Sequence, residues 1–404
     1  MGQAPTAPLH MRRIQFDPIS ELARLRAEAP ASLTEASMGG VRFPAWLITR
    51  YEDVREVLSD AARFSNSGSS VRAYVEAAAG AEAAAGLPLG QSVPLIGYDP
   101  PQHTRLRRML APLFTVQRML RLLPRIETIV TEHLDDMEKH GGPIDLVQAF
   151  ALPIPSLVIC ELLGVPYADR ADFQHQSKVV SDVTIDAEAQ GAALMGLRAH
   201  LTELVRRLRS EPGDSLLGAL VRDHGDELPD EELVGIGTLL LFAGHETTAN
   251  MLSLGALVLL RHPDQLALLR DDRGLVECAV EELMRYLSIV HSGIIRTATQ
   301  DVTIGGKAIK TGDAVVCSLS SANRDQRLTD EPDTLDITRE PTSHVAFGHG
   351  VHHCLGAPLA RMEMRVAYPA LLRRFPGLRL AVPFEEVTFG ESSIFGLRSL
   401  PVDW

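Results

Sequence analysis

The most constraining feature of the chain is a long apolar stretch, Leu233 to Leu260, whose middle is polar. Its length would suit a membrane-spanning helix, which needs about 20 mostly apolar residues. The middle, however, reads Gly244-His245-Glu246-Thr247-Thr248-Ala249-Asn250. A Glu at the centre of a bilayer costs roughly 3 kcal/mol, and the His and Asn add to that cost. We therefore predict a helix from about Pro229 to Arg261 that is buried through the centre of a large soluble domain.

Composition places the chain among globular proteins. It has 404 residues, of which 45% are hydrophobic and 23% charged. That balance is neither disordered nor fibrous. The net charge of −13 argues against a nucleic-acid binder, because binding phosphates needs a basic surface.

The cysteines and the N-terminal residues bear on the compartment. The four cysteines are far apart and form no CxxC pair. Scattered free thiols in a large acidic chain indicate a reducing compartment. Because no charged segment followed by an apolar one opens the sequence, we expect no signal peptide and a cytoplasmic protein.

Helical patterns dominate the chain up to about Tyr286. Within that part we expect Ser65–Tyr98 to be a loop or lid and Val116–Lys139 to be one helix. Thr297–Val316 alternates between turns, which predicts small antiparallel sheets, and Ala357–Phe375 is helical again. With no internal repeat and no clear linker, we predict a mainly α fold with small antiparallel β-sheets, and a single domain over residues 1–404.

The first chemical motif is a glycine-rich loop, FGHGVHHCLG, that ends just before a helix. It runs from Phe347 to Gly356, and Pro358 occupies a favoured early helical position. Cys354 is therefore expected at a helix N-terminus, where backbone N–H groups favour a thiolate. Glycines let the backbone pass close to a flat object. From the loop alone, a buried structural cysteine is an equally good interpretation.

A zinc site is an alternative for the same loop, with ligands from His349, His352, His353 and Cys354. Neighbouring residues of an extended chain point to opposite sides, so the last three cannot easily close one tetrahedral site. No second Cys or His pair supplies the other half, which argues against zinc.

The second motif is AGHETT inside the apolar helix. The Thr247 hydroxyl can bond back to the Ala243 carbonyl, and Gly244 beside it is expected to loosen the helix. A groove for a diatomic ligand and water would open there, with Glu246 as a route for protons. The alternative is a helix irregularity satisfied by buried water. Glu282 and Arg285, three residues apart, mean little alone, since such surface pairs are common.

Together these motifs, in this order, resemble those of the cytochrome P450 family. FGHGVHHCLG is similar to its haem-binding loop, AGHETT to its oxygen-activating helix, and ECAVEELMR to the helix with its Glu-x-x-Arg pair. The resemblance implies a triangular helical prism that encloses haem b between two helices. It also implies that Cys354 is the metal ligand and that O2 is the co-substrate, as in bacterial, particularly actinomycete, members.

The resemblance also implies roles for other residues. Glu246 and Thr247 would be the catalytic residues that deliver protons, and Arg339 would complete a structural network with Glu282 and Arg285. Residues that would contact the cofactor are those at the propionates (His103, Arg107, Arg296 and His352), Phe347 beside the sulfur, and Gly348, Ala243 and Gly356.

Electrons would come from a separate ferredoxin and ferredoxin reductase, because the chain has no dinucleotide or flavin motif. From His103 to Arg125 it carries no Asp or Glu and six arginines: Arg105, Arg107, Arg108, Arg118, Arg121 and Arg125. Their exposed members, with Arg361 and Arg365, would form a docking face for an acidic ferredoxin. The alternative, that they are merely solvated, is equally good. We expect a monomer with no nucleic-acid or membrane partner.

The substrate pocket is expected to be apolar, which implies a bulky hydrophobic small molecule. Its candidate residues are Val93, Ile96, Val179, Leu240, Ala243, Thr248, Val290, Ile294, Ile394 and Phe395. The resemblance favours hydroxylation or epoxidation of a secondary metabolite such as a macrolide, peptide or terpenoid. Oxidative coupling, peroxygenase chemistry and a non-catalytic haem-binding protein are the alternatives.

Overall fold

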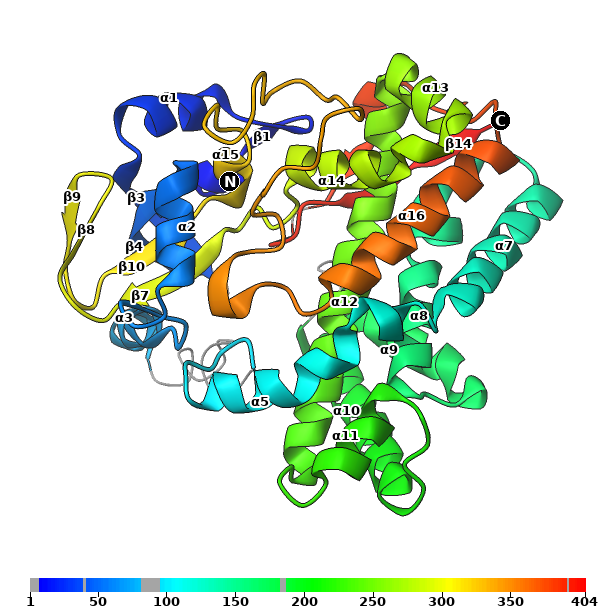
Figure 1. Ribbon diagram of the computed structural model, residues 1–404, viewed down its shortest axis with the longest axis horizontal. Helices are drawn as coiled ribbons and strands as arrows, with labels where there is room; N and C mark the ends of the chain where they lie inside the picture. Colours follow the sequence, from blue (N-terminus) through cyan, green and yellow to red (C-terminus); the bar gives the residue numbers. More distant parts are fainter. Residues whose placement is uncertain (1–6, 39–40, 81–94, 182–186, 391) are drawn as a thin grey trace. The chain divides into compact units, whose positions relative to one another are not determined.

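The computed structural model describes residues 7–38, 41–80, 95–181, 187–390 and 392–404 (Figure 1). The chain divides into two compact units, each built from separate stretches of sequence. The first comprises residues 1–105 and 281–354, and the second residues 106–280 and 355–404. Helices α5 (Gln102–Leu110) and α14 (Val276–Leu287) each begin in one unit and end in the other.

The first unit is organised around a five-stranded sheet of order β3-β4-β10-β7-β5. β10 pairs parallel with β4, whereas its other neighbour and the remaining pairs are antiparallel. The sheet is therefore mixed: it is mostly antiparallel, as predicted, with one parallel pair that the sequence analysis did not predict. A parallel pair joins strands distant in sequence, so no hairpin turn announces it. The bounds are β3 (Ala31–Met38), β4 (Val41–Ile48), β5 (Phe64–Ser65), β7 (Ile294–Ala298) and β10 (Ala314–Cys317).

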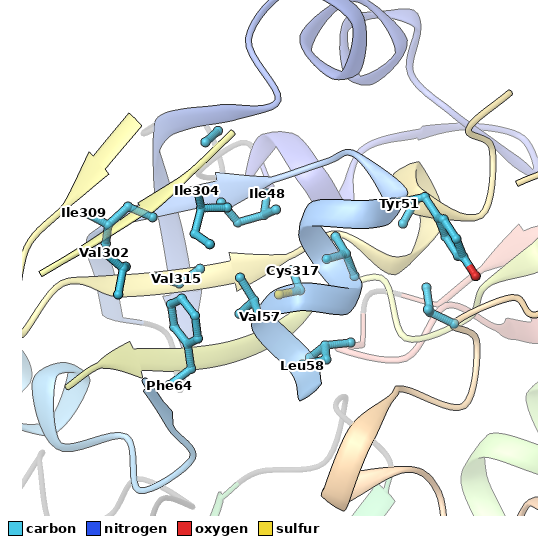
Figure 2. Close-up of a cluster of buried hydrophobic side chains, with 14 of the residues drawn as sticks. Ile48, Tyr51, Val57, Leu58, Phe64, Val302, Ile304, Ile309, Val315 and Cys317 are labelled. Carbon is cyan, nitrogen blue, oxygen red and sulfur yellow. The ribbon is translucent and has the colours of Figure 1, made fainter. Parts of the chain in front are cut away.

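Helix α2 (Tyr51–Ser59) packs on this sheet, and Figure 2 shows the apolar side chains between them. Ile48 of β4, Val57 of α2 and Val315 of β10 are each at most 1% exposed. A hairpin of β8 (Val302–Ile304) and β9 (Lys307–Ile309) adds to the same cluster. The unit also contains β1 (Arg13–Ile14), β2 (Asp17–Pro18), α1 (Ser20–Glu28), α3 (Ser69–Ala79) and α15 (Leu319–Ala322).

The second unit is mainly helical, and α12 (Asp230–Arg261) is its longest described helix (Figure 1). Buried residues, most of them apolar, lie on most faces of α12, as the sequence predicts for a core helix. None of the described helices is both long and apolar enough to cross a membrane. The other helices are α6 (Val116–Met119), α7 (Leu123–His140), α8 (Pro153–Leu163), α9 (Arg170–Ser181), α10 (Ala187–Ser210), α11 (Leu216–His224), α13 (Pro263–Asp271) and α16 (Ala357–Arg374).

Short strands complete the second unit near the end of the chain. β14 (Pro401–Asp403) lies between β11 (Arg379–Leu380) and β6 (Ile144–Asp145), and both pairings are antiparallel. β12 (Thr388–Phe389) pairs with β13 (Leu397–Ser399).

Two sequence predictions about helices are wrong. The stretch predicted as one helix from Val116 to Lys139 is two, α6 and α7, which Pro124 at the start of α7 explains because proline suits a first helical turn. The stretch predicted as a loop from Ser65 to Tyr98 contains α3, and residues 81–94 within it lie outside the described residues.

Candidate functional site

The Cys354 loop of the first unit is held by its own backbone. The N–H of Cys354 donates to the carbonyl of Phe347 at 2.8 Å, and the N–H of Gly348 donates to Val345 at 2.9 Å. Cys354 is exposed. Cys354 is therefore not part of the apolar core of this unit, and the core-cysteine interpretation is wrong here.

Gly350 explains how closely the loop approaches helix α2. A Cβ added at Gly350 would lie 2.5 Å from the Leu58 carbonyl oxygen and 2.7 Å from Ser59 Cα, and its φ is +72°. Both the close approach and the positive φ require glycine. After the loop, α16 begins at Ala357 with Gly356 as N-cap and Pro358 in its first turn. Cys354 thus lies two residues before the N-cap, as predicted.

Glu282, Arg285 and Arg339 come together in the first unit. Arg285 donates to both carboxylate oxygens of Glu282, at 2.7 and 2.8 Å, and Arg339 donates to Glu282 at 3.4 Å. Arg285 and Glu282 side chains are at most 2% exposed. Arg285 also donates to the backbone carbonyls of Asn323, Pro332 and Thr334. A buried ion pair needs such extra hydrogen bonds to offset its desolvation, so the set fixes a long stretch of chain.

The histidines predicted at the haem propionates meet in the first unit. The rings of His103 and His352 are 4.1 Å apart between centroids, and His103 is 2% exposed. Arg296 on β7 is 4% exposed, and burial lowers the pKa of its guanidinium. Its Nη1 donates to the Asn66 side chain and, at 3.0 Å, to the Ile295 carbonyl. Arg107 lies on the part of α5 that belongs to the second unit.

Helix α12 carries the AGHETT motif in the second unit. Thr247 Oγ1 donates to the Ala243 carbonyl at 2.6 Å, as predicted. The expected loosening is absent, since α12 is an unbroken helix from 230 to 261. The reason is that a carbonyl oxygen has two lone pairs, so Ala243 can accept both the backbone and the hydroxyl bond.

Glu246 is the acidic residue of the same motif. Ser392 Oγ donates to its Oε1 at 3.2 Å. Burial raises the pKa of the Glu246 carboxyl, and the hydrogen bond from Ser392 opposes that rise. A carboxyl that keeps its proton more readily than usual can donate it at a higher pH.

The pocket residues predicted from sequence fall in both units. On α12, Leu240 and Thr248 are buried, whereas Ala243 is exposed. Val290 and Ile294 pack against the first unit's core cluster. Phe395 is buried and its ring stacks on Phe389, with centroids 5.5 Å apart. The remaining candidates are Ile394 and Val179, which are half-buried, Ile96, which is exposed, and Val93, which lies outside the described residues.

Two of the arginines predicted for a docking face are already paired within the second unit. Arg125 donates to Glu161 at 2.6 Å, and Arg365 lies 3.0 Å from Glu277. Arg108 and Arg121 are exposed. They are the better candidates for contact with a partner.

The sequence analysis did not identify three polar residues that the structure connects to these motifs: Glu281, His344 and Ser392. His344 contacts Glu281, the residue beside Glu282, and Ser392 contacts Glu246. The partners are 63 and 146 residues apart, so spacing carries no signal for either pair. Among the described residues, no group of three or more His, Cys, Asp and Glu side chains could hold a metal ion, which leaves the zinc interpretation without a site there.

Comparisons with known proteins identify the family. The family model described as Cytochrome P450 matches residues 197–378. Cytochrome P450 FAS1 of Rhodococcoides fascians is 45% identical over 405 residues, which cover 100% of this chain and 100% of the relative. The chain belongs to the cytochrome P450 family. It is therefore a monooxygenase-type oxidoreductase of a family whose cofactor is haem iron.

Other cytochromes P450 support both the fold and the class of reaction. Nocardicin C N-oxygenase of Nocardia uniformis subsp. tsuyamanensis is 44% identical, with 95% of this chain and 94% of the relative covered. The solved structure of P450 StaH from glycopeptide antibiotic A47934 biosynthesis has a TM-score of 0.86 and 43% identity. The match covers 99% of this chain and 100% of StaH. The cytochrome P450 fold predicted from sequence is confirmed.

Proposed function

We propose that the chain is a haem-thiolate monooxygenase in which Cys354 is the iron ligand. Its reaction inserts one oxygen atom from O2 into a bulky hydrophobic small molecule, by hydroxylation or epoxidation. The observation that carries this proposal is the position of Cys354, which a backbone hydrogen bond to Phe347 fixes just before the start of α16, in a member of this family.

The chemistry of the residues that the sequence assigns to the cofactor fits haem b. A Cβ added at Gly356 would meet nothing within 4 Å, which is open space for a flat group beside the loop. His103, Arg107, Arg296 and His352 have the hydrogen-bond donors that two propionate carboxylates require. Phe347, Gly348 and Ala243 are the proposed apolar contacts. When bound, a thiolate-ligated haem iron supplies oxygen activation and favours cleavage of the O–O bond.

Glu246 and Thr247 are the proposed proton-delivery residues. The Thr247 hydroxyl donates a hydrogen bond to the Ala243 carbonyl. The hydroxyl oxygen can therefore accept a hydrogen bond from a donor such as water. Glu246 holds a proton more readily than usual because burial raises the pKa of its carboxyl. The pair can therefore pass protons at the polar middle of a largely apolar helix.

The proposed substrate is a secondary metabolite such as a macrolide, peptide or terpenoid. The candidate pocket residues are mostly apolar, for example Leu240 in the second unit and Val290 and Ile294 in the first, and they offer few polar anchors. Such walls bind by shape and exclude water. Two similar proteins, Nocardicin C N-oxygenase and P450 StaH from glycopeptide antibiotic biosynthesis, support this class.

The ligand assignment is tested by the carbon monoxide difference spectrum of the reduced protein. We expect a Soret band at the position of thiolate-ligated haem, and its loss in Cys354→His. A wild-type band at the position of histidine-ligated haem would overturn the proposal. Turnover of a substrate found by spin-shift screening, under labelled oxygen, then shows whether one labelled atom enters the product.

A ferredoxin and its reductase are the proposed electron donors. Replacing exposed Arg108 and Arg121 with Ala is predicted to slow reduction by an acidic ferredoxin and to flatten its dependence on salt. The matched control is Arg206→Ala with Arg222→Ala, which removes the same charge from exposed arginines of α10 and α11. An unchanged salt profile, or peroxide-driven turnover that needs no ferredoxin, contradicts this assignment.

A further inference from the structure

We infer that Glu281 and His344 are a pair of positioning residues that holds the start of the Cys354 loop and thereby keeps the thiolate on iron. The inference rests on the proposed function, since it assumes that Cys354 is the ligand. All of the residues that carry it lie in the first unit.

The contact between the two side chains is buried. His344 Nε2 lies 3.2 Å from Glu281 Oε2, and the side chains are 2% and 11% exposed. The backbone N–H of Ala346 points at His344 Nδ1, at 3.3 Å. Because an N–H can only donate, Nδ1 must be the acceptor, and the ring proton is therefore on Nε2. His344 thus donates to Glu281 while it accepts from Ala346, which fixes the orientation of its ring.

This ring is connected to Cys354 through a short run of backbone. Ala346 precedes Phe347, whose carbonyl accepts the N–H of Cys354 at 2.8 Å. On the other side of Ala346, the Val345 N–H donates to Asn323 Oδ1 at 2.8 Å. Losing the His344 bond would free the Ala346 amide, which lies between these two anchors, and would leave the Phe347 carbonyl less firmly positioned, with the turn bond from Gly348 to Val345 remaining.

Glu281 is not a duplicate of Glu282. Glu282 uses its two oxygens on Arg285, Arg339 and the N–H of Asp336. Glu281 is the next residue back along α14 and binds His344 instead. The two adjacent carboxylates therefore hold two different segments: Glu282 the chain around Asp336 and Arg339, and Glu281 the residues that lead directly into the loop.

Removing one partner leaves the other buried with a lost hydrogen bond, which has a cost in free energy. If that cost falls on the loop, the thiolate form of the reduced carbon monoxide complex should be lost about tenfold faster in Glu281→Ala and His344→Phe. In Glu281→Gln, which keeps an acceptor oxygen, the rate should stay close to wild type. His344→Asn keeps an acceptor near Nδ1 but cannot reach Glu281, so it should resemble Glu281→Ala.

The measurement follows the Soret band on mild warming and, in parallel, global unfolding by circular dichroism. Loss of the thiolate band ahead of unfolding supports a positioning role. Two controls are Glu277→Ala, an exposed residue of the same helix, and Gly255→Ala, expected to destabilise the second unit away from the loop. In both, the band and the fold should be lost together.

Wild-type rates of band loss in Glu281→Ala and His344→Asn would overturn the pair, and so would equal, early loss in Glu277→Ala. If Glu281→Ala yields no folded protein, the contrast between Glu281→Gln and His344→Asn decides the same question. A wild-type protein without the thiolate band would refute the proposed function instead.

Discussion

At the scale of single residues, His245 shows how burial sets the protonation of a side chain inside α12. It is 5% exposed and its ring hydrogen-bonds to the backbone of Leu152. Burial lowers the pKa of His245 to about 4, so the imidazole is neutral at neutral pH. The neighbouring Glu246 responds to burial in the opposite direction, because burial disfavours the charged form of each.

A pH dependence of stability follows for His245. Its pKa is 6.5 in the unfolded chain and about 4 in the folded one, so the unfolded chain binds more protons between these values. Stability is therefore complete above pH 6.5 and falls with pH toward 4, by up to about 3 kcal/mol. In His245→Gln, denaturant unfolding at pH 7 and pH 5 should show a smaller difference than in wild type. An equal difference in the two proteins contradicts the assignment.

Single residues differ in how far the sequence predicts them. The Cys354 loop and the Glu282–Arg285 pair are local patterns, and the structure connects that pair with Arg339 as expected. The conformation of the loop can be predicted from its glycines, because the positive φ of Gly350 and its close approach to Leu58 both require glycine. His344 and Ser392 form no local pattern, since their partners are brought to them only by folding.

At the scale of elements, α12 and α16 approach closely at Gly255. The Tyr368 hydroxyl on α16 donates to the carbonyl of Met251 on α12, and Tyr368 is 1% exposed. A Cβ added at Gly255 would lie 2.7 Å from Tyr368 Cζ. Glycine weakens a helix interior, so its presence here reflects the packing of the tyrosine ring.

Gly255→Ala is predicted to destabilise the protein by about 1–3 kcal/mol, because the extra methyl group overpacks this contact. The matched control is Gly191→Ala in α10, where an added Cβ meets nothing within 4 Å. There the substitution should stabilise by about 0.5–1 kcal/mol through helix propensity. Denaturant unfolding measures both values. Effects of the same sign would show that propensity, and not the Tyr368 contact, decides the outcome at Gly255.

Elements were predictable where the chain itself marks their ends. α12 begins after Pro229, and α16 begins at Ala357, between the N-cap Gly356 and Pro358 in the first turn, as expected from their residues. α3 was missed because it lies in a stretch rich in Gly, Ala and Ser, although Val71 and Val75, four residues apart, bury one of its faces. The parallel pairing of β10 with β4 was missed because parallel partners are far apart in sequence.

At the scale of the whole molecule, the two units are interleaved along the chain. The chain passes between them after residues 105, 280 and 354, the last of which is Cys354. A linear sequence shows no linker at these points, and α5 and α14 even continue across two of them. The sequence predicts a single domain, which means that the two units should unfold together. A measurement of unfolding tests this prediction.

Native-state hydrogen exchange on Gly255→Ala provides that measurement. If the units open separately, exchange should rise about tenfold only in the second unit, at amides such as Leu257 in α12 and Val402 in β14. Leu47 in β4 and Val316 in β10 should keep their wild-type rates, because their sheet bonds lie within the first unit. Gly191→Ala should slow exchange in the second unit alone. An equal rise at all four amides of Gly255→Ala would show instead that the chain unfolds as one cooperative domain, because destabilising one unit would then destabilise both by the same free energy.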